Sequence, residues 1–201
     1  MQEKLFFYVD NKNKNILDIP KKLNNSWKGI IGLNFLSDEE LIDLEWSGHP
    51  DFGFIPWNAE YTNLLKNYKC TDKIFLLFKN CIKECIFNLR QEVENGGVEV
   101  DDKYFISTDD SSKLLLHTMY FNIINNSEKI EDEFKFKTAN GIVKFTQKEF
   151  KSLFNSINFF IKNCLEKEIE LIDIIDEKNS FLELIEIDFY NSFNVSNKIK
   201  L

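Results

Sequence analysis

The sequence predicts an α+β protein that is mainly helical, with two β-hairpins forming a small antiparallel sheet and a small N-terminal α/β segment. Three observations predict this class. Apolar residues recur at intervals of three and four over residues 58–94 and 146–176, as they do on one face of a helix. Residues 98–108 and 134–145 instead alternate apolar and polar side chains around a turn signal. Residues 1–57 combine a short apolar strand, a short helix and a loop.

The N-terminal segment, residues 1–57, is expected to form a small unit with an aromatic loop. It begins with an apolar strand, "KLFFYVD", followed by the turn-rich "NKNKN". "LSDEELIDLEW" predicts a short helix, because Ser37 and Glu40 have the spacing of a capping box. "SGHPDFGFIPW" predicts a loop, because glycine and proline interrupt it repeatedly.

Residues 58–190 are expected to form a helical domain with both hairpins, and residues 191–201 a polar, loose tail. The first long helix loses its spacing near Cys70, so either a kink or two helices is expected there. "ENGG" ends that helix, since Gly96 and Gly97 tolerate the left-handed conformations of a C-cap. "VEVDDKYFIST" then predicts the first hairpin.

A second helix is expected over residues 109–125, with an apolar stripe made of Leu114, Leu115, Met119 and Ile123. "FKFKTANGIVKFT" predicts the second hairpin, with Asn140 and Gly141 as a two-residue type I′ turn.

Two further capping boxes predict the last helices. Thr146 and Glu149 open a long helix that continues to about residue 176. Ser180 and Glu183 repeat the spacing at the start of "SFLELIEID", which predicts a short closing helix.

The charge of the chain argues against nucleic-acid binding. The 201 residues include 25 basic and 33 acidic side chains, which gives a net charge of −8. Arg90 is the one arginine, whereas base recognition relies on arginine forks on a basic face. We therefore expect no direct nucleic-acid binding and a protein partner, which an acidic chain meets through electrostatic steering.

Neither a signal peptide nor a membrane span is expected, because no apolar stretch approaches the roughly 20 residues that a span requires. The four cysteines have no CxxC spacing and are expected to be free, partly buried thiols. The alternative is a metal site at Cys81 and Cys85 with His49 or His117, but nothing in the sequence brings a histidine to them. We expect no metal and no cofactor.

"STDDSSKLLLH" raises the question of catalysis. Thr108, Asp109 and Asp110 lie where a strand pattern ends and a helical period begins, as helix-capping residues do. A catalytic role needs a second group, and His117 lies two turns further on, roughly 12 Å along the helix. "DFG" at residues 51–53 lacks the other kinase motifs, and no Walker, Rossmann, HExxH or GxSxG motif is present. No catalytic residue is therefore assigned.

An aromatic loop is the candidate partner-binding site. Glycine and proline break its backbone, and such loops often carry function. Tryptophan and tyrosine are favoured anchors of protein interfaces. The candidates are Trp46, His49, Phe52, Phe54, Trp57 and Tyr61. The alternative is that these rings fill the space between the N-terminal segment and the first long helix.

The order of features in the C-terminal half resembles a module of unknown function found in tail-fibre and tail-fibre-assembly proteins of tailed bacteriophages. Three strings carry the resemblance, "GGVEVDDKYFISTDDSSKLLL", "FKFKTANGIVKFTQKEF" and "LIDIIDEKNSFLELIEIDF", over about residues 80–190. The matching positions are Gly97, Phe105, Thr108, Asp109, Ser112, Phe136, Asn140, Gly141, Thr146, Glu149, Ile175 and Ile185. "LSDEELIDLEW" also resembles phage tail proteins, although Glu45 stands where they usually have glycine.

This resemblance implies a non-enzymatic interaction protein of phage or prophage origin, associated with the tail or assisting tail-fibre assembly. Its partner would be a tail component, its location the bacterial host cytoplasm or the virion tail, and a homo-oligomer stays open. An alternative of another class is an inhibitor of host immunity, similar to anti-CRISPR proteins, that binds a Cas effector. A third is a small hydrolase built on the acidic pairs.

Overall fold

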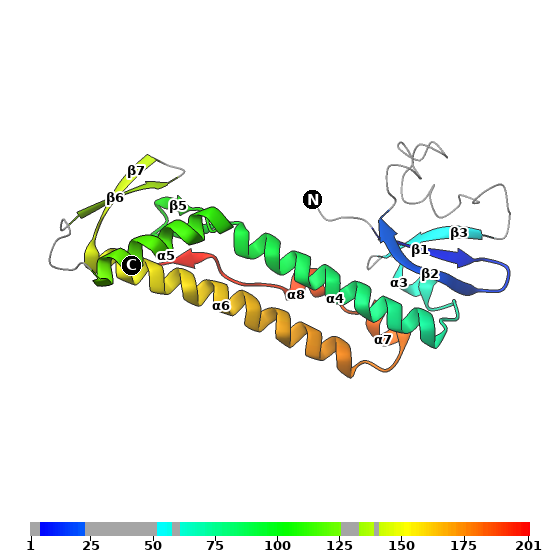
Figure 1. Ribbon diagram of the computed structural model, residues 1–201. Helices are drawn as coiled ribbons and strands as arrows, with labels where there is room; N and C mark the ends of the chain where they lie inside the picture. The colour runs from blue at the N-terminus through cyan, green and yellow to red at the C-terminus, as the bar shows by residue number, and fades with distance from the viewer. Residues whose placement is uncertain (1–4, 23–51, 58–60, 126–132, 139–140) are drawn as a thin grey trace. The chain divides into compact units, whose positions relative to one another are not determined.

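The computed structural model describes residues 5–22, 52–57, 61–125, 133–138 and 141–201. These residues form an α+β fold that is mainly helical, with small sheets built from antiparallel hairpins (Figure 1), as the sequence predicts. The expected helix at "LSDEELIDLEW" lies outside the described residues.

The chain divides into two compact units. Unit 1 comprises Met1–Cys85 and Asp173–Asp188, and unit 2 comprises Ile86–Ile172 and Phe189–Leu201. This division differs from the expected boundary at residue 57, because two long helices, α4 (Asp72–Asn95) and α6 (Gln147–Glu177), each contribute to both units.

Unit 1 contains a three-stranded antiparallel sheet with the strand order β2-β1-β3. Its strands are β1 (Leu5–Asp10), β2 (Asn15–Lys22) and β3 (Phe52–Pro56). The sequence indicated only the first of them. Proline lies in both of the others, at Pro20 and Pro56, which is tolerated because β2 and β3 are the edge strands.

The core of unit 1 is aromatic. Phe7 and Phe78 are fully buried, and each ring lies 5.6 Å from that of Phe181. These residues come from β1, from α4 (Asp72–Asn95) and from α7 (Phe181–Ile185). Ser180 and Glu183 form the predicted capping box of α7. Because each residue comes from a different element, the aromatic cluster ties them together.

The expected interruption near Cys70 is confirmed as a break between two helices, α3 (Thr62–Leu65) and α4. The backbone of Lys69 leaves the helical path there. Its carbonyl accepts a hydrogen bond from Ile16 N at 2.9 Å, and its N–H donates to Lys14 O at 2.7 Å. The intervening segment therefore adds to β2 instead of continuing a helix.

Unit 2 contains both predicted hairpins, but in separate sheets and not in one as expected. One hairpin pairs β4 (Val98–Val100) with β5 (Tyr104–Ile106), and the other pairs β6 (Glu133–Thr138) with β7 (Gly141–Thr146). The first turns at Asp101 and Asp102, which both have positive φ, at 52° and 54°.

The C-terminal segment is docked in unit 2, whereas the sequence predicted a loose tail. β8 (Lys198–Ile199) pairs parallel to β4, and Glu99 N and Asp101 N donate to Asn197 O and Ile199 O, both at 2.9 Å. Ahead of it, α8 (Phe189–Ser192) begins at a buried phenylalanine. A two-residue strand is too short for its period to be recognised in a sequence.

The turn of the β6–β7 hairpin differs from the expected type I′ turn at Asn140 and Gly141. Thr138 pairs with Gly141, so Gly141 is the first ladder residue of β7, and residues 139–140 connect the strands. Gly141 still has a positive φ of 122°, a conformation that few other residues adopt. Asn140 lies outside the described residues.

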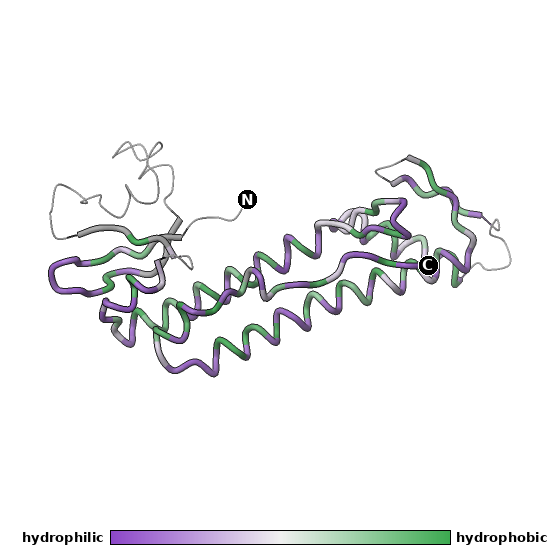
Figure 2. Tube along the Cα trace, turned by 180° about the vertical axis from the view of Figure 1, so that it is seen from behind, coloured by the Kyte–Doolittle hydropathy of each residue, from purple (hydrophilic) through white to green (hydrophobic). Residues whose placement is uncertain are grey.

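The helices of unit 2 begin and end close to the predicted residues. α5 spans Asp110–Asn125 and α6 spans Gln147–Glu177, opened by the predicted capping box of Thr146 and Glu149. Hydrophobic and hydrophilic residues alternate along α6 about once a turn (Figure 2), and its buried stripe includes Phe150 and Leu153. Phe134 and Phe136 of β6 lie against Phe150, at 5.9 and 6.4 Å between ring centroids.

Candidate functional site: the outer face of helix α5

The structure places the residues of the predicted aromatic loop in different settings. Trp46 and His49 lie outside the described residues, and Phe52 and Phe54 belong to strand β3. Trp57 is half-buried, with its ring 4.9 Å from that of Phe78 and 6.5 Å from that of Phe7. Tyr61 is half-buried at the N-cap of α3. Trp57 thus packs on the core of unit 1, and the partner-binding role of the loop stays a prediction.

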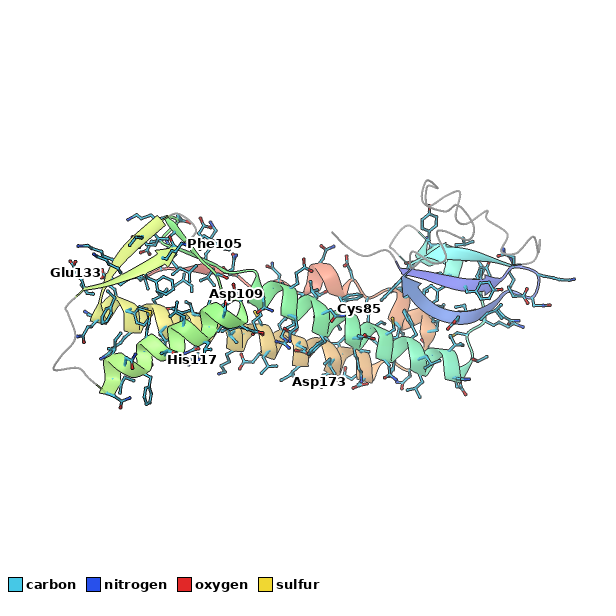
Figure 3. All side chains as sticks on the ribbon, turned by 45° about the horizontal axis from the view of Figure 1, so that its top comes forward. Cys85, Phe105, Asp109, His117, Glu133 and Asp173 are labelled. Carbon is cyan, nitrogen blue, oxygen red and sulfur yellow. The ribbon has the colours of Figure 1, made fainter. Side chains whose placement is uncertain are left out.

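Asp109 caps α5, as the sequence predicts (Figure 3). Its Oδ1 accepts from the backbone N–H of Ser112 at 2.8 Å, and hydroxyls of Ser107 and Ser111 donate to it at 2.6 Å. These hydrogen bonds hold the pKa of Asp109 well below its usual range. A carboxylate so committed to the helix end is a structural group and a poor general base.

Thr108 does not cap α5, contrary to the expectation, but closes the preceding helix. Thr108 is fully buried. Its Oγ1 donates a hydrogen bond to the carbonyl of Glu94 and accepts one from the backbone N–H of Gly97 at 3.0 Å. The last carbonyls of a helix have no partner within it, and Thr108 supplies one for α4. Sequence spacing gave no sign of this contact, because fourteen positions separate Thr108 from Glu94.

A buried charge network joins α4, α5 and α6 inside unit 2. Glu94 forms ion pairs with Arg90 and with Lys113, and the Nζ of Lys113 lies 2.7 Å from Oε1 of Glu94. Arg90 also pairs with Glu168, with 2.7 Å between its Nε and the Oε2 of that carboxylate. Burial raises the pKa of Glu94, but hydrogen bonds from Lys113 and Arg90 outweigh it and leave that pKa below its usual value. Each carboxylate is paired with a cation, so the cluster serves packing and offers no free acid or base.

Metal binding finds no support in the described part of the chain, which contains no group of three histidine, cysteine or acidic residues able to hold an ion. Cys81 and Cys85 lie one turn apart on α4, and the hydrogen bond between their thiols, with burial, strongly raises the pKa of Cys81. That favours the thiol over the thiolate that binds metals. His117 belongs to unit 2, where its ring lies 4.9 Å from that of Phe154.

Helix α5 has an unusual outward face. Leu116 and Ile123 are buried, whereas four large apolar side chains are exposed: Leu114 by 69%, Leu115 by 52%, Phe121 by 68% and Ile124 by 51%. We call these four residues the outer α5 face. The expected apolar stripe was therefore wrong for Leu114 and Leu115, which point away from the core.

On a helical wheel, the outer α5 face is centred on Leu114 and Phe121. Leu114 and Phe121 are seven residues apart, which is two turns, so they lie above one another. Leu115 and Ile124 flank them on either side. His117, on the same helix (Figure 3), is also exposed.

Two polar side chains on the outer side of α5 form hydrogen bonds with the backbone of the same helix. Thr118 Oγ1 donates to Leu114 O at 2.9 Å, and Asn125 Nδ2 donates to Phe121 O at 2.9 Å. Each of these side chains thus directs one donor to the helix's own backbone, while His117 and Asn122 are the other exposed polar residues of this stretch. Between Leu114 and Asn125 the helix contains no acidic or basic residue other than His117.

Exposed apolar side chains on α6 have a different setting. Leu165 and Ile169 are exposed by 48% and 51%, but ion pairs between Lys162 and Glu166 and between Lys167 and Glu170 surround them in sequence. Such scattered apolar residues are ordinary on protein surfaces. The outer α5 face differs because no charged residue interrupts it.

The chain matches no protein-family model, and comparisons with curated proteins and with solved structures found no match. In the described residues, no helix is both long enough and apolar enough to cross a membrane.

The sequence contained a signal for the outer α5 face that a search for one apolar stripe overlooks. "LLLHTMYFNII" has apolar residues at too many positions for a single buried stripe. A surface helix normally has a polar face opposite its apolar one, and a helix that is apolar all round is buried. This helix is apolar on the packed side and on the outer side.

Proposed function

We propose that the chain is a non-enzymatic protein-interaction protein that binds its partner through the outer α5 face. The observation that supports this proposal is a three-turn helix surface whose one acidic or basic residue is His117, on a protein with a net charge of −8. Contiguous exposed apolar patches mark interaction sites in soluble proteins.

The energetics favour such a role. Burial of one leucine or phenylalanine side chain contributes about 1.5–3 kcal/mol, and this face offers four large apolar side chains. Hydrogen bonds from Thr118 and Asn125 to backbone carbonyls lower the cost of desolvating these two side chains. Few charged anchors are available, so binding energy is expected to concentrate in Leu114 and Phe121, which lie at the centre.

The biological setting that we propose is phage tail assembly or association with the tail. This part rests on the resemblance of residues 80–190 to the tail-fibre module. The outer α5 face lies within that stretch, so an assembly role like that of the tail-fibre module would place the partner among tail components.

Affinity capture from phage-infected host cells tests the proposal. The double substitution Leu114→Gln and Phe121→Gln removes the centre of the face while keeping helix-forming residues. The matched control is Phe159→Gln and Ile169→Gln on α6, two residues that are exposed by 63% and 51%.

Both variants are first compared with the parent protein by circular dichroism and thermal unfolding. We expect the α5 variant to lose captured partner by at least tenfold, since two hot-spot side chains are lost, and the α6 variant to retain it. Equal capture by all three proteins would refute a binding role for the outer α5 face.

A further inference from the structure

The β6–β7 hairpin has one apolar face and one basic face. Its ladder pairs Phe134 with Phe145 and Phe136 with Val143 on the side that packs against α6. The opposite side carries Lys135 across from Lys144, and Lys137 across from Ile142. We call Lys135, Lys137, Lys144 and Ile142 the basic hairpin face. All four are exposed, Ile142 by 73%.

This arrangement costs stability. Lys135 and Lys144 occupy directly opposed positions of an antiparallel pair, where like charges destabilise. Of the acidic residues that the structure describes on this hairpin, Glu133 forms an ion pair with Lys144 at 2.9 Å. Lys135 and Lys137 have no ion pair among the described residues. A glutamate at position 135 would remove the repulsion, so stability alone does not explain the lysine.

The hairpin and the first turn of α6 carry a local excess of lysine in an acidic chain. Residues 133–151 contain five lysines and two glutamates, a net charge of 5 − 2 = +3, whereas the whole chain has −8. Lys148 and Lys151, which follow on α6, likewise have no ion pair in the part of the chain that the structure describes. Among the described residues, the excess of positive charge is therefore local, and Glu133 is the one acidic residue that pairs with it.

We propose that the basic hairpin face is a docking surface for an acidic segment of a partner protein. Charge complementarity selects the acidic side chains, and exposed Ile142 between the lysines offers a contact for an apolar residue. This surface is separate from the outer α5 face, and the inference goes beyond the function proposed above.

A protein segment fits the surface better than a nucleic acid. Binding to single strands relies on exposed aromatic rings that stack on bases, and the rings of this hairpin, Phe134, Phe136 and Phe145, lie on the opposite face. The face also lacks the arginine forks that read bases.

A fluorescein-labelled peptide that alternates glutamate and valine serves as the probe, with binding to the full chain followed by fluorescence anisotropy in 50 mM salt. The test variant is Lys135→Glu with Lys137→Glu. The matched control is Lys103→Glu with Lys200→Glu, which makes the same change of net charge at two exposed lysines of the same unit.

We expect the hairpin variant to bind the peptide at least tenfold more weakly than the parent, and the control to bind within twofold of it. We also expect the hairpin variant to unfold at the same or a higher temperature, because the opposed like charges are gone. Loss of binding then has no explanation in loss of folding.

Three results would overturn the inference: no saturable binding of the peptide, equal weakening in the control variant, or tighter binding of a labelled oligothymidylate than of the peptide. The first two would return the lysines to a solubilising role. The third would assign the face to nucleic acid. None of these outcomes bears on capture of a partner through α5, so the two proposals fail separately.

Discussion

Replacement of Thr108 by valine should destabilise unit 2 far more than an ordinary Thr→Val change. Valine has nearly the same shape but no hydroxyl, so the carbonyl of Glu94 and the N–H of Gly97 would both lose their partner in a site with no exposure to solvent. Each buried polar group left without a hydrogen bond costs about 1–3 kcal/mol. The expected loss for the two groups together is about 2–6 kcal/mol, a large fraction of the 5–15 kcal/mol that stabilises a typical domain.

The matched control is Thr118→Val on the outer side of α5. Thr118 is exposed, and its hydroxyl donates to a carbonyl inside a helix, so this change should stay within about 0.5 kcal/mol. Thr108→Ser keeps the hydroxyl and should lose only about 1 kcal/mol for the buried methyl group.

Urea denaturation followed by circular dichroism measures all three variants. The midpoint should fall in the order parent, Thr118→Val, Thr108→Ser, Thr108→Val, with an unchanged dependence on denaturant. The reasoning is refuted if Thr108→Val and Thr118→Val unfold at the same urea concentration.

Three further predictions follow from single sites. Gly97→Ala should destabilise the protein more than Gly141→Ala, because its added Cβ would lie 2.9 Å from the backbone oxygen of Ile106 and displace the Phe105 ring, at a φ of +91°. Gly141→Ala meets no atom within 4 Å and should cost only about 1–3 kcal/mol of backbone strain in a melting experiment. Glu94→Gln should cost about 1.5–3 kcal/mol at pH 7, because Arg90 and Lys113 each lose one of their two carboxylate partners. Folding lowers the pKa of Glu94, so the stability lost in Glu94→Gln should be fully seen above the ordinary pKa of 4.5. It should disappear as the pH falls through the folded-state pKa, and an equal loss at pH 7 and pH 3 would contradict the pairing. All four cysteines should titrate as free thiols in denaturant without reductant, and a recovered disulfide would contradict this.

Local patterns predicted much of the fold because the forces behind them are local. The capping boxes at Thr146 and Ser180 need only a side chain and a backbone amide three residues apart, so the sequence indicates them directly. The hairpins were predicted from alternation around a turn. The turn at Gly141 was misplaced by one residue, since glycine's positive φ also suits the first ladder position.

Long-range contacts were not predictable in this way. The pairing of β8 with β4 joins residues about a hundred positions apart, and Thr108 closes a helix that belongs to a different part of the sequence. The candidate site shows the same limit. Leu114 and Leu116 are the same residue type, two positions apart on α5. Only the tertiary packing of the helix decides that Leu116 is buried and Leu114 exposed.

Site-specific photo-crosslinking tests the central claim, that the outer α5 face binds a partner protein. Benzoylphenylalanine is placed at position 121 on α5 and, as a control, at position 159 on α6, each in place of an exposed phenylalanine. After irradiation of phage-infected host cells, we predict a discrete adduct at position 121 that disappears when Leu114 is changed to Gln, and none of the same size at position 159. No adduct at position 121, or the same adducts at both positions, would contradict the claim.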